Sequence, residues 1–193
     1  MRRTTFATLA TAAASAAAGC YVAVVRGDLT LDLGWGRSTV PLGPQRVEIA
    51  AERSVVFDVV SSPYLRQTPK AMEGKLQVIC RGSDMVLAAH RTPAVAGLVT
   101  TTVETVRFVA PERVEFALVR GPVPCAEETF VLHEAPGGTR LDYQGELGVD
   151  LFGLGRLWGR AVARRWEATV AASLEAIKAE SERRAAHGRD RRA

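Results

Sequence analysis

The sequence predicts an α+β fold, in which a curved antiparallel β-sheet wraps around one long C-terminal α-helix, with two short helices after the first strand. Residues 75–150 divide into about six alternating segments separated by turn residues, which is typical of consecutive antiparallel strands. Residues 153–185 instead repeat apolar side chains at helical spacing. A helix of about 30 residues is roughly 45 Å long and needs an apolar surface of similar length. The strands supply that surface.

Residues 1–26 are predicted to be a membrane anchor or a signal segment. Arg2 and Arg3 precede an uncharged, alanine-rich stretch over residues 4–25. This stretch is about long enough to span a bilayer as a helix, while residues 16–18 supply the small side chains of a signal-peptidase site. The residues before Cys20 resemble a lipoprotein cleavage site, and a disordered alanine-rich tail is the remaining alternative.

The valines that follow Cys20 favour the uncleaved anchor, because they continue the apolar run past the cleavage sites. Arg2 and Arg3 outnumber Arg26 on the other side of the run, which favours a cytoplasmic N-terminus. We therefore expect the protein at the cell membrane, with the domain outside the cytoplasm. Residues 27–44 are predicted to be a connector, because glycine and proline recur in them.

The folded domain is predicted over residues 45–182. Residues 45–51 alternate as a first strand. Residues 52–62 form a short helix that Pro63 ends, and residues 63–72 form a second short helical or irregular piece. The six following strands are expected over residues 75–81, 84–91, 97–109, 113–120, 125–134 and 139–150.

The closing helix is predicted to carry an apolar side, and the glycines between residues 153 and 159 let its start approach the sheet closely. The expected apolar side comprises Leu154, Trp158, Val162, Trp166, Thr169, Val170, Ser173 and Ile177. Residues 183–193 are arginine-rich without apolar periodicity and are predicted to be a disordered tail. This tail accounts for much of the net charge of +4. No aromatic residues interleave with its arginines, so no nucleic-acid partner is expected.

Metal, disulfide and phosphate chemistry leave no signature in this sequence. The three cysteines and three histidines are not spaced as zinc ligands, and no glycine-rich phosphate loop is present. His90 has no assignable carboxylate partner and is predicted to be structural. We therefore expect no metal and no cofactor, and the sequence pattern assigns no catalytic residue.

Four stretches carry a resemblance to a known superfamily. They are VEIAA at 47–51, VVFDVV at 55–60, GTRLDY at 138–143 and the segment 158–167, which begins Trp-Gly-Arg and ends Trp-Glu. With the order of elements, they resemble the helix-grip fold of the START and Bet v 1-like superfamily, SRPBCC, over roughly residues 45–180. Within it the chain is similar to the polyketide cyclase/dehydrase branch. The resemblance implies a cavity between sheet and helix, and cyclases of that branch work there without a cofactor.

Three function classes follow from this resemblance. The first is binding of a hydrophobic small molecule, lipid-like or polyketide-like, in the cavity by a membrane-tethered protein. The second is an enzyme, a cofactor-independent polyketide cyclase or dehydratase that uses the same cavity. The third is a structural or interaction module whose interior is filled by its own side chains.

Strand alternation nominates the polar residues of such a cavity. Arg120 and Glu128 both share parity with inward apolar residues, so we expect an inward ion pair, either ligand-binding or purely structural. Tyr143 is inward on a clean alternation and contacts either a ligand or a backbone carbonyl. Trp158 and Arg165 lie on the apolar side of the long helix as further candidates. The alternatives are a core tryptophan and an arginine that extends to the cavity mouth.

Overall fold

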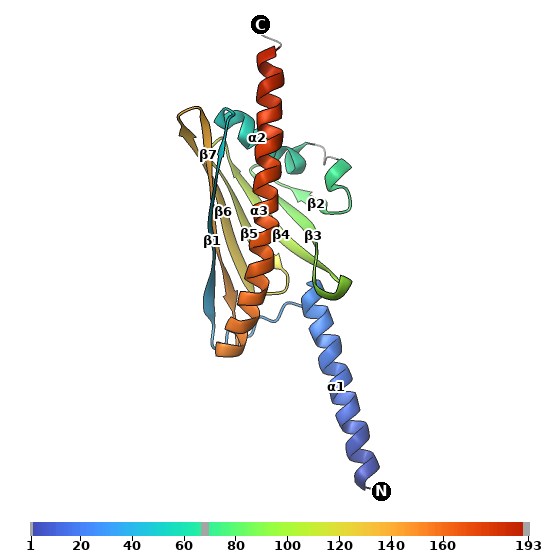
Figure 1. Ribbon diagram of the computed structural model, residues 1–193. Helices are drawn as coiled ribbons and strands as arrows, with labels where there is room; N and C mark the ends of the chain where they lie inside the picture. Colours follow the sequence, from blue (N-terminus) through green and yellow to red (C-terminus); the bar gives the residue numbers. More distant parts are fainter. Residues whose placement is uncertain (1, 67–69, 191–193) are drawn as a thin grey trace.

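A computed structural model describes residues 2–66 and 70–190 of the chain. Seven strands form one antiparallel sheet in the order β1-β7-β6-β5-β4-β3-β2, and the long helix α3 lies along one face of it (Figure 1). The strands are β1 Ser38–Ile49, β2 Leu76–Arg81, β3 Met85–Pro93, β4 Val99–Val109, β5 Arg113–Arg120, β6 Cys125–Ala135 and β7 Gly138–Val149. The helices are α1 Arg2–Arg26, α2 Arg53–Leu65 and α3 Phe152–Asp190, with 3₁₀ turns η1 Lys70–Met72 and η2 Val95–Gly97. The predicted α+β helix-grip fold is confirmed.

The first strand is longer than predicted. It begins at Ser38 rather than at residue 45, because Ser38 to Leu42 pair with the end of β7. The pairing register shifts between Leu42 and Gln45, where the Gly-Pro sequence interrupts the ladder. The connector is correspondingly shorter than the predicted 27–44.

In the described part of the segment after β1 there is one α-helix rather than two. Helix α2 passes Pro63 and ends at Leu65, and the amide of Arg66 still donates to the Ser62 carbonyl at 3.0 Å. The second predicted piece is reduced to the 3₁₀ turn Lys70–Met72, and residues 67–69 of it lie outside the described part of the chain.

Helix α3 extends further than predicted, up to Asp190. The prediction of a disordered tail from residue 183 was therefore wrong for residues 183–190, and residues 191–193 lie outside the described chain. Glu180 pairs with both Arg183 and Arg184, one turn further along the helix, and Arg184 also pairs with Asp58 of α2. Ion pairs at this spacing, together with the contact to α2, support the last turns of the helix.

The side of α3 that faces the core agrees in part with the predicted apolar side, because Trp158, Val162, Trp166, Val170 and Ile177 pack against the core. Leu154, Thr169 and Ser173 are exposed. The residues that are buried against the strands are mostly small, namely Gly155, Gly159, Ala163, Val170 and Leu174. A Cβ on Gly159 would lie 2.7 Å from Val149 and 2.9 Å from Val40. The helix backbone therefore approaches β1 and β7 closely, as the glycines predicted.

Helix α1 leaves the domain at the end where α3 begins (Figure 1). Its last turns contact the domain, because the Tyr21 ring packs edge-on against Trp158 at 6.1 Å and the Thr100 hydroxyl donates to the Val25 carbonyl. Within residues 2–66 and 70–190, no helix combines the length and the apolar character needed to cross a bilayer. The structure thus gives the transmembrane alternative no support, and anchoring stays a prediction.

The close approach of α3 predicts opposite effects of one substitution at two glycines. Gly159→Ala should destabilise the protein by about 1–3 kcal/mol, because the methyl group overlaps two valines of the sheet. Gly153→Ala meets only the end of the Arg156 side chain, at 4.0 Å, and should leave stability unchanged or raise it through helix propensity. Urea denaturation of both variants measures the difference, and equal effects would contradict the packing described.

Candidate functional site

The inner face of the central strands carries buried polar side chains among apolar ones. On β4, Glu104 shares its face with Val106, and on β6, Glu128 shares its face with Phe130. Both carboxylates are almost fully buried, with 5% of Glu104 and 7% of Glu128 exposed. Buried carboxylates are costly unless they are hydrogen-bonded, so their partners determine what this face does.

Glu128 joins the sheet to the long helix. Its Oε2 accepts a hydrogen bond from the Tyr143 hydroxyl of β7 at 2.6 Å and another from the Trp166 indole N–H of α3 at 2.7 Å. Burial, followed by the neighbouring negative charge of Glu104, raises the pKa of Glu128 from 4.5 to about 7, although both hydrogen bonds act in the opposite direction. Burial also raises the pKa of Tyr143, which therefore remains a donor.

Glu104 belongs to a second group, which runs to α2. Its Oε2 lies 2.9 Å from Nδ1 of His90 on β3, and Nε2 of His90 lies 3.1 Å from the Tyr64 hydroxyl. Burial lowers the pKa of His90, but the hydrogen bond and the charge of Glu104 outweigh it, so the net shift is upward. The imidazole is thus held between an acceptor and a hydroxyl, an arrangement that favours its charged form.

The two groups act on each other electrostatically. Glu104 pairs with Leu118 of β5, and Phe116 of the same strand pairs with Glu128, so the two residues stand two strands apart and two residues out of register, about 12 Å at the backbone. Burial is the main cause of the raised pKa of Tyr64, and the charge of Glu128 contributes to it and to the raised pKa of His90. We call these six residues the buried polar centre: Tyr64, His90, Glu104, Glu128, Tyr143 and Trp166.

Aromatic rings connect the two halves of the buried polar centre. Phe116 lies between Tyr64, at 6.2 Å, and Phe130, at 5.5 Å, and Phe130 contacts Tyr143 at 5.2 Å. Helix α3 packs mainly on β1, β7 and α2 rather than on β4 and β5. Phe116 and Leu118 on the inner face are accordingly only half-buried. The polar centre therefore adjoins an apolar surface that α3 does not close.

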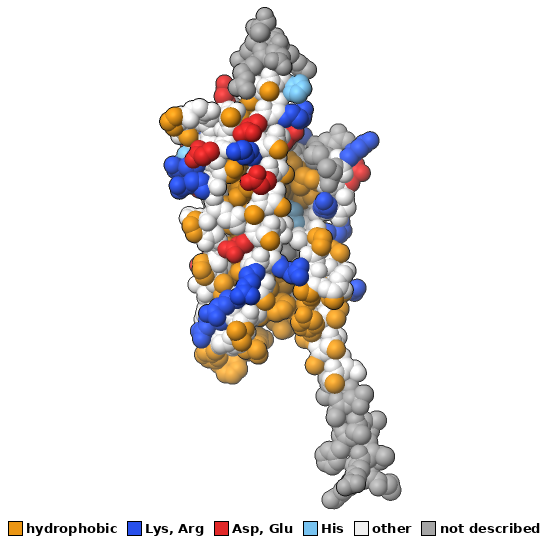
Figure 2. Space-filling view, in the orientation of Figure 1, with side chains coloured by type: hydrophobic (Ala, Val, Ile, Leu, Met, Phe, Trp, Pro, Cys, Tyr) orange, Lys and Arg blue, Asp and Glu red, His pale blue; other side chains and the backbone are white. Residues whose placement is uncertain are grey.

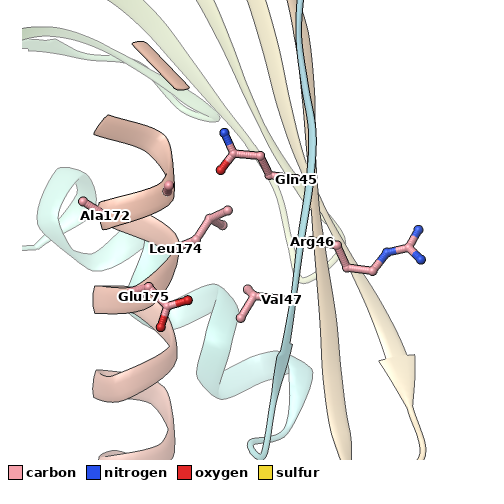
Figure 3. A pocket seen from close by; sticks show the side chains of 7 residues that line it. Gln45, Arg46, Val47, Ala172, Leu174 and Glu175 are labelled. Atoms are coloured by element: carbon pink, nitrogen blue, oxygen red, sulfur yellow. The ribbon is translucent and has the colours of Figure 1, made fainter. Parts of the chain in front are cut away.

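Two hollows are found on the surface of the described residues. The first, of about 290 Å³, lies between β1 and α3, where Gln45 and Val47 point toward the helix and Arg46 points away (Figure 3). Its volume is at the lower end for small-molecule sites. The second, of about 390 Å³, lies on the central strands and is lined by outward residues such as Thr105, Glu115 and Thr129, and also by Phe116 and Glu128. Neither hollow is lined by the predicted residues of the helix.

The predicted ion pair between Arg120 and Glu128 is not formed. Glu128 pairs with Phe116 rather than with Leu118, and within the described chain Arg120 is exposed without an ionic partner. The pairing of β4 with β5 skips one residue between the pairs Glu104–Leu118 and Val103–Arg120. A bulge of this kind reverses the face of every residue beyond it, so Arg120 points outward.

The other predicted residues have different surroundings. Tyr143 is completely buried and donates to Glu128, rather than to a backbone carbonyl. Trp158 is half-buried, and its indole N–H donates to the Pro122 carbonyl at 2.8 Å. Arg165 is exposed on α3. The structure thus brings Tyr143 and Glu128 together and leaves Trp158 and Arg165 outside the buried polar centre. Ligand binding by any of these residues stays a prediction.

Sequence reasoning missed Tyr64, His90 and Glu104. Glu104 did carry a signal, because it is the one acidic residue of a strand of valine and threonine and it shares parity with Val106. An acidic residue at an inward position requires a partner, and His90 is on the neighbouring strand. The sequence carried no such signal for the contact of Tyr64 with His90, because α2 reaches β3 only through the tertiary fold.

The buried polar centre can hydrogen-bond a ligand and can exchange protons near neutral pH. The oxygens Oε1 of Glu104 and of Glu128 have no hydrogen-bond partner among the described residues. A carboxyl with a pKa of about 7 can act as acid or base under physiological conditions. No set of three or more His, Cys, Asp or Glu side chains in the described chain is arranged to hold a metal ion.

The raised pKa of Glu128 predicts a fall in stability between about pH 4.5 and pH 7. The folded state holds this proton more tightly than the unfolded state, so the stabilisation is complete below pH 4.5 and is lost as pH rises through 7. The shift corresponds to roughly 3 kcal/mol. Glu128→Gln should remove this dependence in urea denaturation at pH 5 and pH 8. The matched control is Glu127→Gln on the exposed face of the same strand, and identical profiles for both variants would contradict the assignment.

The contact between Glu104 and His90 predicts a change in histidine titration. In Glu104→Gln, burial should dominate, and the pKa of His90 should fall below its ordinary value. NMR of the imidazole carbons measures this directly, with the exposed His133 and His187 as references in the same sample. A titration of His90 that the substitution leaves unchanged would show that the two side chains do not interact.

Solved structures with the same fold include aromatase/cyclases. The Zhui aromatase/cyclase from Streptomyces sp. R1128 superposes with a TM-score of 0.60 at 14% identity, over 77% of this chain and 95% of that one. The protein TTHA0849 from Thermus thermophilus gives 0.55 at 16% identity, over 75% and 96%. The di-domain ARO/CYC BexL from the BE-7585A biosynthetic pathway gives 0.52 at 19% identity, over 78% of this chain but 50% of its own. At these identities the likeness shows the fold alone.

Sequence comparison identifies the family. No curated protein matches the chain significantly. The sequence model of the family described as "Polyketide cyclase / dehydrase and lipid transport" matches residues 44–182. The matched segment begins within β1 and ends in α3. It therefore contains the sheet except for the first residues of β1, and it contains the entire buried polar centre. The chain therefore belongs to the polyketide cyclase/dehydrase and lipid transport family, within the START and Bet v 1-like superfamily.

Proposed function

We propose that this protein binds a hydrophobic small molecule that carries a hydrogen-bond donor, such as a hydroxyl group, at the buried polar centre. The observation that carries this proposal is that Oε1 of Glu104 and Oε1 of Glu128 accept no hydrogen bond from any described residue, on an inner face that also carries Phe116 and Leu118. A ligand hydroxyl would donate to one of these acceptors, and the ligand's apolar body would cover Phe116 and Leu118.

The surroundings of the carboxylates support ligand binding over a purely structural role. A core that served stability alone would be better stabilised by apolar residues than by two neighbouring buried carboxylates. Few precisely placed polar groups within apolar walls are the usual composition of small-molecule sites. The family description, which includes lipid transport, is consistent with an apolar ligand.

A second candidate function is proton-transfer catalysis at the same centre. The specific observation in its favour is His90, which Glu104 and Tyr64 hold on either side, near a carboxyl with a pKa of about 7. Such a pair can remove a proton next to a carbonyl and protonate a departing hydroxyl, so that water leaves and a carbon–carbon double bond forms. The aromatase/cyclase names of the similar structures favour this class of reaction.

Membrane attachment through residues 1–26, with the domain outside the cytoplasm, is part of the same proposal. It rests on the composition of that segment and on the position of α1, which leaves the domain at one end (Figure 1). Fractionation of expressing cells should place the full-length chain with the membranes. Recovery of the uncleaved chain in the soluble cytoplasmic fraction would overturn this part of the proposal.

Ligand binding is tested with two probes that differ only in the donor. 2-Naphthol should bind at least tenfold more tightly than 2-methoxynaphthalene, because only the former can donate to the carboxylates. Either Glu128→Gln or Glu104→Gln, whichever carboxylate accepts the hydroxyl, should reduce that preference, whereas Glu127→Gln on the outer face should keep it. Quenching of tryptophan fluorescence measures affinity, since Trp166 contacts Glu128. Absence of saturable binding by either probe would favour the structural class.

The catalytic candidate has its own test. Incubation with 4-hydroxydecan-2-one, a β-hydroxy ketone with an apolar tail, should generate the conjugated enone, whose absorbance reports loss of water. His90→Gln should abolish this activity while 2-naphthol still binds. Binding without any dehydration would leave the protein as a binding module and would remove the catalytic candidate.

A further inference from the structure

Exposed hydrophobic side chains concentrate at one end of the domain. Except for Leu65 and Ile79, every large hydrophobic residue that the described chain exposes lies at the end where α3 begins and α1 leaves. Figure 2 shows these side chains gathered at the bottom of the domain. The most exposed members on the connector and α3 form what we call the apolar tip: Leu33, Trp35, Phe152, Leu154 and Leu157. Of these, Trp35 and Leu154 are 66% and 69% exposed.

The apolar tip is a built structure rather than a loose end. Asp150 accepts the amides of Leu33 and Gly34 at 2.7 and 2.9 Å and pairs with Arg37 at 2.9 Å. The hydrogen bond from Arg37 lowers the pKa of Asp150 to about 2, so this anchor stays charged at physiological pH. The Leu151 amide, just before α3, donates to the Trp35 carbonyl at 2.8 Å, and the Phe152 amide at the start of α3 donates to the Gly36 carbonyl at 3.1 Å. These bonds hold the connector against the helix.

The turn into α3 adopts a costly backbone conformation that presents an apolar side chain to solvent. Leu151 and Phe152 both have positive φ, at 68° and 52°, a region that residues with a side chain rarely occupy. The Phe152 ring packs edge-on against Trp35 at 5.4 Å and covers Gly36 so closely that a Cβ there would lie 2.5 Å from it. Apolar rings that are fixed in place but exposed to water leave their hydrophobic surface unburied, which indicates a partner that covers them.

Arginines border the apolar tip on α3. Arg156, Arg160 and Arg164 follow one another every fourth residue, so they form a row, and all three are exposed without ionic partners among the described residues. Figure 2 shows Lys and Arg side chains in a row directly above the exposed hydrophobic end. Successive members are about 6 Å apart along the axis. An apolar surface with a cationic border matches the layers of an anionic bilayer, which are acyl chains and then phosphates.

We propose that the apolar tip docks on the surface of an anionic lipid bilayer, in addition to any attachment through α1. Trp35, Phe152, Leu154 and Leu157 enter the boundary between headgroups and acyl chains. Arg156 and Arg160 lie at the height of the phosphates, and Arg164 lies about 6 Å beyond Arg160, where its attraction is partly screened. Helix α3 then stands steeply on the membrane, with the buried polar centre above it.

The first experiment measures the charge contribution with the full-length chain. Binding is measured by flotation with phosphatidylcholine vesicles that contain about one third phosphatidylglycerol, and a basic residue near such a surface contributes about fivefold. Arg156→Glu/Arg160→Glu should lower partitioning at least tenfold, and Arg164→Glu should have a smaller effect. The matched control Lys75→Glu/Arg81→Glu changes the net charge equally at exposed positions around β2 and should bind like wild type. Equal losses of partitioning in both double variants would show that only the net charge matters, and that result would overturn the proposal.

The second experiment separates the apolar tip from α1. Phospholipids brominated near the headgroup quench the fluorescence only of tryptophans that enter the bilayer. Wild-type protein should therefore show quenching. The variant Trp35→Phe, which keeps Trp158 and Trp166, should show none. Leu154→Ser/Leu157→Ser should reduce the quenching of Trp35 because these exposed side chains insert beside it. If α1 alone attaches the chain, vesicles will bind the protein without quenching Trp35, and that outcome rejects the proposal.

Discussion

One carboxylate joins the three parts of this molecule that define its interior. Glu128 stands on β6 and accepts hydrogen bonds from β7 and from α3 through the same oxygen. Because α3 approaches the sheet over β1 and β7 through glycine and alanine, the indole of Trp166 reaches this carboxylate while β4 and β5 lie beyond the main contacts of the helix. The position of α3 therefore determines which strands it covers and which are left to α2.

The second group stands on the part of the inner face that α3 does not reach. His90 and Glu104 come from β3 and β4, two strands that α3 hardly contacts, and Tyr64 comes from α2, which packs on α3 and supplies the wall on that side. Six polar residues and two phenylalanines, Phe116 and Phe130, thus form one contiguous group in the interior. A binding site for a molecule with a polar group explains that composition, and the same surface could transfer protons if the molecule carries a carbonyl group.

Most of the fold could be predicted from the sequence, because alternation and turn residues are local signals. The β5 strand has the predicted bounds, and the other central strands differ by one or two residues. The site could be predicted only in part. Tyr143 and Glu128 followed from alternation, but the bulge beside Glu104 moved Arg120 to the other face, and a single irregularity in pairing leaves no trace in the sequence pattern. The hydroxyl of Tyr64 and the indole of Trp166 enter through helix packing, which is not local.

The central claim is that the buried polar centre is a ligand site. Carbon-detected NMR of the glutamate carboxyl groups, assigned with the Glu→Gln variants, tests it most directly during titration with 2-naphthol. The account predicts saturable shifts of the Glu104 and Glu128 signals at one equivalent, with Glu175 in the hollow beside β1 unaffected. Shifts at Glu175 alone, or no shift at Glu104 and Glu128 when the protein is saturated, would contradict it.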